Sequence, residues 1–180
     1  MSADEIMQLR ARVRQLEDRE EIRGLVSRYG RVVDDREWDV LADLFAPDAV
    51  FDSVGGRAVG MAAIAEYYKA GTQDHVASYH YAHSHEISFD DADRPSGLVC
   101  AHAEIAFEDD TVWTALRYHD QYRRVDGRWR FSERVTRLLY VLKLADLPTG
   151  FADEMRVRWP GREPVRATLG ADVAAEAAAD

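Results

Sequence analysis

The spacing of apolar residues changes near Val76, and this change limits the possible fold more than any other feature of the chain. Before it, apolar residues recur every three or four positions, as in helices. After it come four strand-like runs, at residues 78–89, 98–107, 111–124 and 128–142. The Asp126-Gly127 pair between the last two runs is typical of a hairpin turn. Helices followed by a meander of strands predict an α+β fold, with the helices covering one face of an antiparallel sheet.

Residues 4–35 predict two helices, or one bent helix, ending near Asp35. A narrow apolar stripe, formed by Ile6, Leu9, Val13 and Leu16, fits either an arm that packs on a partner subunit or a surface helix of its own domain. A second stripe begins at Ile22. Further along we expect a short helix over 38–45, a strand over 49–54 and a third helix over 61–70.

These patterns divide the chain into an N-terminal helical arm (1–19), one central domain (20–147) and a C-terminal arm or tail (148–180). The last segment is rich in turn breakers, such as Pro160-Gly161, and ends in alanines.

Composition excludes several classes of function. A formal net charge of −10 argues against a nucleic-acid partner, because phosphate binding requires a basic surface. Cys100 is the only cysteine, so neither a disulfide framework nor a cysteine metal motif is present. The N-terminus lacks the pattern of a signal peptide, and no apolar run approaches membrane-spanning length. We therefore expect a cytoplasmic protein without a membrane partner.

The segment "YHYAHSHE", residues 79–86, holds three of the six histidines: His80, His83 and His85. In a strand, His83 and His85 share one face and could hold a divalent ion with a carboxylate from elsewhere. This segment alone cannot supply enough ligands, so we predict no metal site. Glycine patterns of nucleotide-binding folds are also missing, and we predict no cofactor.

An acid–base function requires a histidine with a carboxylate that orients it. Asp34 and Asp35 end the second apolar helix, where Asp35 is best explained as a solvated cap. Asp34 lies about 100° around the helix from Val33, at the rim of the apolar face, where a pocket can open.

Three segments together resemble the SnoaL-like family of the nuclear transport factor 2-like superfamily. They are "EIRGLVSRYGRVVDDREWDVLADLFAPDAVFD", "SYHYAHSHEISF" and "DGRWRFSER", and the resemblance spans residues 20–141. It implies a cone: a curved antiparallel sheet packed against the N-terminal helices and enclosing an apolar pocket. Members of the family include scytalone dehydratase, hexachlorocyclohexane dehydrochlorinase and polyketide cyclases, whereas dioxygenase beta subunits have a structural role.

The resemblance also implies roles for particular residues. Asp34 and His80 match an Asp–His dyad that abstracts protons, and His102 matches loosely a second catalytic histidine. The predicted substrate-binding residues are Tyr29, Ser53, Tyr81 and His85. Val33 and Ser53 stand where the dehydratase has tyrosines, so its particular substrate is not implied.

Strict alternation along this strand conflicts with the predicted role of His80. If Ile87 and Phe89 face the core, His85 and His83 face it too, and His80 faces outward. A bulge, or a strand that starts at His80, would resolve the conflict. Without one, His85 or His83 becomes the pocket base.

The sequence thus predicts a cofactor-independent lyase or isomerase that acts on a hydrophobic small molecule, aromatic or polyketide-like. The alternative is a non-catalytic binding protein or structural subunit of the same fold, and a metal-dependent oxygenase is a distant third. Members of the family form dimers and trimers, and the stripe at residues 6–16 is compatible with either, so we expect a homo-oligomer.

Overall fold

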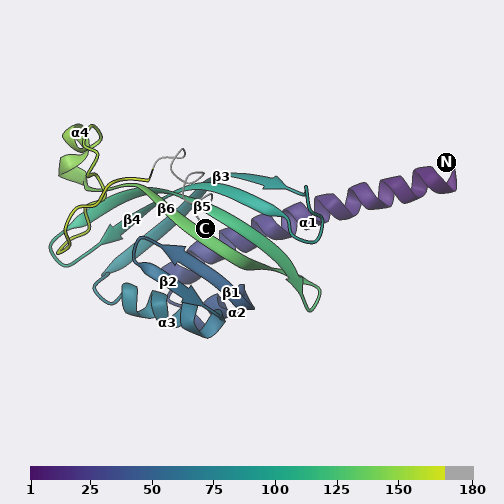
Figure 1. The fold of residues 1–180 in the computed structure, drawn as a ribbon, viewed down its shortest axis with the longest axis horizontal. Coiled ribbons are helices and arrows are strands. Elements are labelled where there is room, and N and C mark those ends of the chain that lie inside the picture. Colours follow the sequence, from purple (N-terminus) through teal and green to yellow (C-terminus); the bar gives the residue numbers. More distant parts are fainter. Residues whose placement is uncertain (169–180) are drawn as a thin grey trace, which may run out of the picture.

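The computed structural model describes residues 1–168 and shows a curved six-stranded sheet with helices packed on it (Figure 1). The helices are α1 (Ala3–Asp34), α2 (Trp38–Asp43), α3 (Met61–Gly71) and the short α4 (Leu147–Gly150), which follows a 3-10 turn at Leu144–Asp146. The strands are β1 (Phe45–Ser53), β2 (Gly56–Val59), β3 (Ala77–Ser88), β4 (Ser96–Ala106), β5 (Thr111–Val125) and β6 (Arg128–Lys143). The predicted α+β class and the cone-like arrangement are confirmed.

The sheet is open and mixed, with the strand order β2-β1-β6-β5-β4-β3. The expectation of a purely antiparallel sheet is wrong at one place, since β1 pairs with β6 in parallel. The connection from β1 to β6 runs through α3 and four other strands, which allows the two to lie in the same direction. The Asp126-Gly127 turn joins β5 and β6 as predicted, and both residues have positive φ angles.

Of the two alternatives for the N-terminal segment, two helices or one, the structure has one continuous helix of 32 residues. Ser2 and Glu5 form a capping box at its start. The second apolar stripe, from Ile22 to Val33, is buried against the sheet, whereas the first half of α1 projects beyond the body of the molecule (Figure 1).

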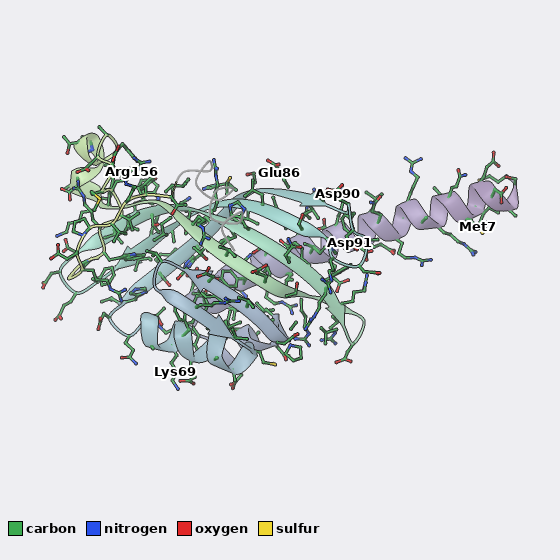
Figure 2. All side chains as sticks on the ribbon, viewed as in Figure 1. Met7, Lys69, Glu86, Asp90, Asp91 and Arg156 are labelled. Carbon is green, nitrogen blue, oxygen red and sulfur yellow. The ribbon has the colours of Figure 1, made fainter. Side chains whose placement is uncertain are left out.

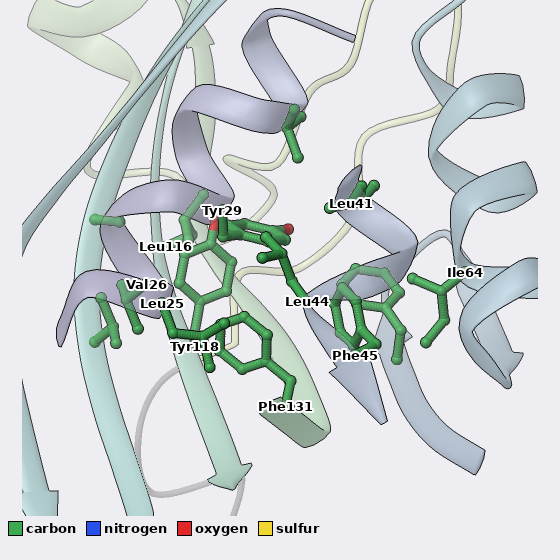
Figure 3. Packing of buried hydrophobic residues seen from close by; sticks show 14 of the residues in the cluster. Leu25, Val26, Tyr29, Leu41, Leu44, Phe45, Ile64, Leu116, Tyr118 and Phe131 are labelled. Carbon is green, nitrogen blue, oxygen red and sulfur yellow. The ribbon is translucent and has the colours of Figure 1, made fainter. Parts of the chain in front are cut away.

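The core between α1 and the sheet contains a buried ion pair. Arg134 is fully buried, and its Nε and Nη2 donate to the two carboxylate oxygens of Asp120 at 2.8 and 2.7 Å. The guanidinium lies 4.0–4.1 Å from the ring centres of Tyr29, Tyr118 and Phe131, which pack together in Figure 3. Burial alone would lower the pKa of Arg134, but the Asp120 carboxylate reverses this and raises it. The positive charge is thus held within an aromatic cluster.

Part of the predicted tail packs against the sheet. Val157 bridges to Val141 of β6 and to Val165, so residues 157–165 fold back on themselves. The remainder of that tail, from residue 169, lies outside the described residues. No helix of the described chain is long and apolar enough to cross a membrane.

Candidate active site

The C-terminus of α1 and the edge strand β3 meet at Asp34 and His80. The Nδ1 of His80 donates to Asp34 Oδ1 at 2.6 Å, because a carboxylate can only accept. The backbone N–H of His80 and the hydroxyl of Ser78 donate to the same carboxylate at 2.8 and 2.9 Å. Three donors therefore fix the orientation of Asp34, and both side chains are largely buried, with 15–17% of their surface exposed.

Gly30 permits this close approach of helix and strand. A Cβ atom at this position would lie 3.3 Å from both the Cβ and the carbonyl oxygen of His80. A larger side chain would push α1 away from β3 and lengthen the Asp34–His80 bond.

His80 lines a partly open, largely apolar cavity of about 220 Å³ between α1, α3, the sheet and the C-terminal segment. Since Asp34 occupies Nδ1, Nε2 is the ring nitrogen that His80 can offer to a ligand. The cavity is lined mainly by aromatic and aliphatic side chains, among them Val33, Phe51, Ile105, Phe107, Leu116, Leu138 and Trp159. Such a wall suits a hydrophobic ligand.

Three tyrosine hydroxyls supply polar groups in this cavity. Tyr29 (α1), Tyr68 (α3) and Tyr118 (β5) all line it, and the hydroxyls of Tyr29 and Tyr68 are hydrogen-bonded to each other. Burial raises the pKa of all three hydroxyls, against the opposing effect of the nearby Arg134 charge. They therefore remain protonated at neutral pH and can donate hydrogen bonds.

Of the predicted substrate-binding residues, Tyr29 and Ser53 line the cavity. Ser53 shares a hydrogen bond of 2.6 Å with Tyr67, another lining residue. Four further lining residues were not predicted from the sequence: Tyr67, Tyr68, Tyr118 and Trp159. The two-residue spacing of Leu116 and Tyr118 indicates that both face the same side of the sheet, which could have identified Tyr118. The sequence of α3 does not indicate which face of that helix meets the cavity.

Tyr81 and His102 do not line the cavity that His80 lines. They pair directly across β3 and β4, so they share the outer face of the sheet, opposite to His80. There Tyr81 is 47% exposed and stacks on His102, which also contacts His83. Their predicted roles are therefore not supported by their positions, because adjacent strand residues point to opposite faces and neither residue lines the cavity.

A bulge between Ala82 and Ser84 resolves the conflict over the histidines. The extra residue, His83, shifts the alternation, so that His80 and His85 both face the helical side of the sheet. His85 nevertheless lies away from the cavity, because it is hydrogen-bonded at 3.0 Å to Tyr122, whose hydroxyl donates to the buried Asp120. Its predicted role in substrate binding is therefore not supported by its position.

Within residues 1–168, no three His, Cys, Asp or Glu side chains are arranged to hold a metal ion.

Comparison with known proteins identifies the class of this fold and site. A model of the SnoaL-like domain family matches residues 14–135, more than half of the chain. The chain therefore belongs to the SnoaL-like domain family, and its fold is that of the nuclear transport factor 2-like proteins.

Solved structures with the same fold include enzymes. The hexachlorocyclohexane dehydrochlorinase LinA-type3 from Novosphingobium barchaimii LL02 is 25% identical, with a TM-score of 0.69, over 73% of this chain and 92% of that one. A protein of Novosphingobium aromaticivorans, provisionally assigned as a scytalone dehydratase, is 16% identical, with a TM-score of 0.68, over 86% and 97%. An NTF2-like protein from the same organism is 28% identical, with a TM-score of 0.63, over 77% and 92%.

Proposed function

We propose that this protein is a cofactor-independent lyase or isomerase that removes a proton from a hydrophobic small molecule with the Asp34–His80 dyad. The observation that carries the proposal is the 2.6 Å bond between His80 Nδ1 and Asp34 Oδ1 at the wall of an apolar cavity. Asp34 holds His80 in the tautomer whose free Nε2 is the base, and it stabilises the imidazolium that forms.

The reaction begins when His80 Nε2 takes a proton from a carbon of the substrate. The electron pair of that C–H bond then forms a carbon–carbon double bond. In an elimination, a leaving group on the adjacent carbon departs with its own electron pair, and a hydroxide leaves as water after protonation by the imidazolium. In an isomerisation, the imidazolium returns the proton to a different carbon, and no group is lost.

The tyrosine hydroxyls suit a substrate in which negative charge develops on oxygen. Donors that are already oriented in a site shielded from water stabilise such charge more than water does. Because Tyr29, Tyr68 and Tyr118 stay protonated, we propose that they face a carbonyl oxygen that becomes an enolate. The charge of Arg134 beneath two of these rings favours the same polarity.

The cavity limits the size of the ligand. Its volume of about 220 Å³ exceeds the roughly 150 Å³ that accommodates benzene in an engineered cavity. A molecule of one or two rings, aromatic or polyketide-like, fits these limits. The dehydrochlorinase and the provisional dehydratase among the similar structures support a lyase-type role.

The test is a screen of hydroxylated aromatic ketones and β-hydroxy ketones in D₂O. Proton NMR detects both deuterium exchange at acidic carbons and loss of water. We expect activity with a subset of these compounds, reduced by about 10²–10⁴-fold in Asp34→Asn and in His80→Gln.

Asp35→Asn is the matched control, because this neighbouring aspartate is exposed and paired with Arg31. It should retain full activity. Ketones that bind in the cavity without exchange or turnover, with the same affinity in Asp34→Asn, would instead identify a non-catalytic binding protein.

A further inference from the structure

The N-terminal half of α1 carries an apolar stripe that the rest of the described chain leaves uncovered. Leu9, Val13 and Leu16 are 50%, 44% and 66% exposed, and Ile6 is partly exposed. This part of the helix projects away from the sheet (Figure 1), and Figure 2 shows the side chain of Met7 in the same projecting segment. Exposed aliphatic side chains at this spacing are typical of a helix that packs on another helix.

The stripe faces away from the body of the molecule. At 100° per residue, the mean direction of the stripe lies roughly 180° around α1 from the buried residues between Ile22 and Val33. A second helix lying on the stripe would therefore not meet the sheet of its own subunit. It would lie on the solvent side of α1.

The stripe follows a heptad repeat whose flanking charges are self-complementary. Ile6 and Val13 occupy a positions, and Leu9 and Leu16 occupy d positions. In a parallel pair, each g residue faces the e residue five positions further along the partner. Here Glu5 would face the second copy's Arg10, and Arg12 would face its Glu17, so each pair joins opposite charges.

The four charged residues of these pairs are not used in ion pairs within the described part of their own chain. The ion pairs that α1 and its C-cap make within the described chain use other residues: Asp18, Glu20, Glu21, Arg23, Arg31, Asp34 and Asp35. Glu5 accepts a bond from the Ser2 backbone through Oε2 only, and a carboxylate has a second acceptor oxygen.

We propose that residues 5–17 pair with the same segment of a second copy of this chain as a parallel two-stranded coiled coil. The two α+β domains then lie on opposite sides of the helix pair, because each stripe faces away from its own sheet. Two heptads bury a limited area, so the dimer dissociates on dilution. The dyad and cavity of each subunit are remote from this contact, and the proposal does not depend on the proposed function.

Cysteine cross-linking tests the parallel arrangement in the full-length chain. In a Cys100→Ser background, Leu9→Cys should form a disulfide dimer on mild oxidation, because identical d positions face each other in a parallel pair. Met7→Cys is the matched control: it is 62% exposed but lies outside the stripe, and it should remain monomeric on a denaturing gel.

Sedimentation velocity over a concentration series tests the charge pattern. Arg12→Glu should raise the dissociation constant about tenfold, since it replaces two attractions by two repulsions. The double variant Arg12→Glu/Glu17→Arg should restore the wild-type value. The proposal is overturned if the chain stays monomeric, if the double variant is no tighter than Arg12→Glu, or if Leu9→Cys cross-links to Val13→Cys in preference to itself.

Discussion

Removing one charge of a buried ion pair destabilises this protein strongly, because the remaining charge cannot be solvated by water. Asp120 is 2% exposed and Arg134 is fully buried, and each neutralises the other. Asp120→Asn keeps the shape of the side chain but leaves the Arg134 charge uncompensated. We expect the free energy of unfolding, measured with urea, to fall by about 3–5 kcal/mol.

A second variant separates charge from packing. In Asp120→Asn/Arg134→Met no buried charge remains, so this double variant should be more stable than Asp120→Asn. If the two variants unfold at the same urea concentration, the cost arises from lost packing and not from the unpaired charge.

The sequence predicted only part of this residue-level chemistry. Asp34 and His80 were singled out because a carboxylate at a helix end and a histidine-rich strand matched a known arrangement. Asp120 was not predicted, although it lies between Tyr118 and Tyr122 on the same buried face of β5. A single aspartate in a strand-like run is usually interpreted as a solvent-exposed residue. Its partner Arg134 lies on another strand, β6. The pairing depends on strand register, which the hydrophobic pattern of one chain does not reveal.

At the level of elements, most helices and strands were predictable, and the irregular features were not. The α+β order followed from the change of periodicity, and the β5–β6 hairpin followed from Asp126-Gly127. The parallel pairing of β1 with β6 and the bulge at His83 depend on contacts between distant segments. This bulge decides that His80 faces Asp34, so the site could not be fixed from strand alternation alone.

Two glycines show how an element's neighbours determine the effect of the same substitution. A Cβ at Gly97 of β4 would lie 2.9 Å from His85 Nε2 and would also overlap the Tyr122 hydroxyl. Tyr122 is held by Asp120 and cannot yield easily. We expect Gly97→Ala to destabilise the protein by about 1–3 kcal/mol in urea unfolding.

Gly24→Ala is the matched substitution, because nothing lies within 4 Å of a Cβ at this position of α1. Alanine should stabilise the helix by about 0.5–1 kcal/mol. Equal effects of the two substitutions would show that backbone entropy, and not the contact with Tyr122 and His85, governs Gly97.

For the whole molecule, a buried hydrogen-bond network links β3 to β6 and predicts how stability depends on pH. It consists of His85, Tyr122, Asp120 and Arg134. Burial lowers the pKa of His85 to about 4, with Arg134 and Arg23 acting in the same direction and Asp120 opposing them. Between pH 6.5 and 4 the unfolded chain therefore binds a proton at this residue and the folded protein does not. The free energy of unfolding falls as the pH decreases through this window, and His85 ceases to contribute to the change below about pH 4.

Urea unfolding at pH 7 and pH 5 measures this effect, because at pH 5 the folded protein still holds His85 neutral. From the shift to about 4, His85 alone should cost the folded state on the order of 1–2 kcal/mol at pH 5. His85→Gln retains a donor for Tyr122 but does not titrate, so its loss of stability between these pH values should be smaller by that amount. An identical loss in wild type and His85→Gln would place the pH dependence elsewhere, on His75, His102 or His119, whose pKa values burial also lowers. The comparison therefore shows whether the neutral state of His85, which donates to Tyr122 within this buried network, determines the loss of stability at low pH.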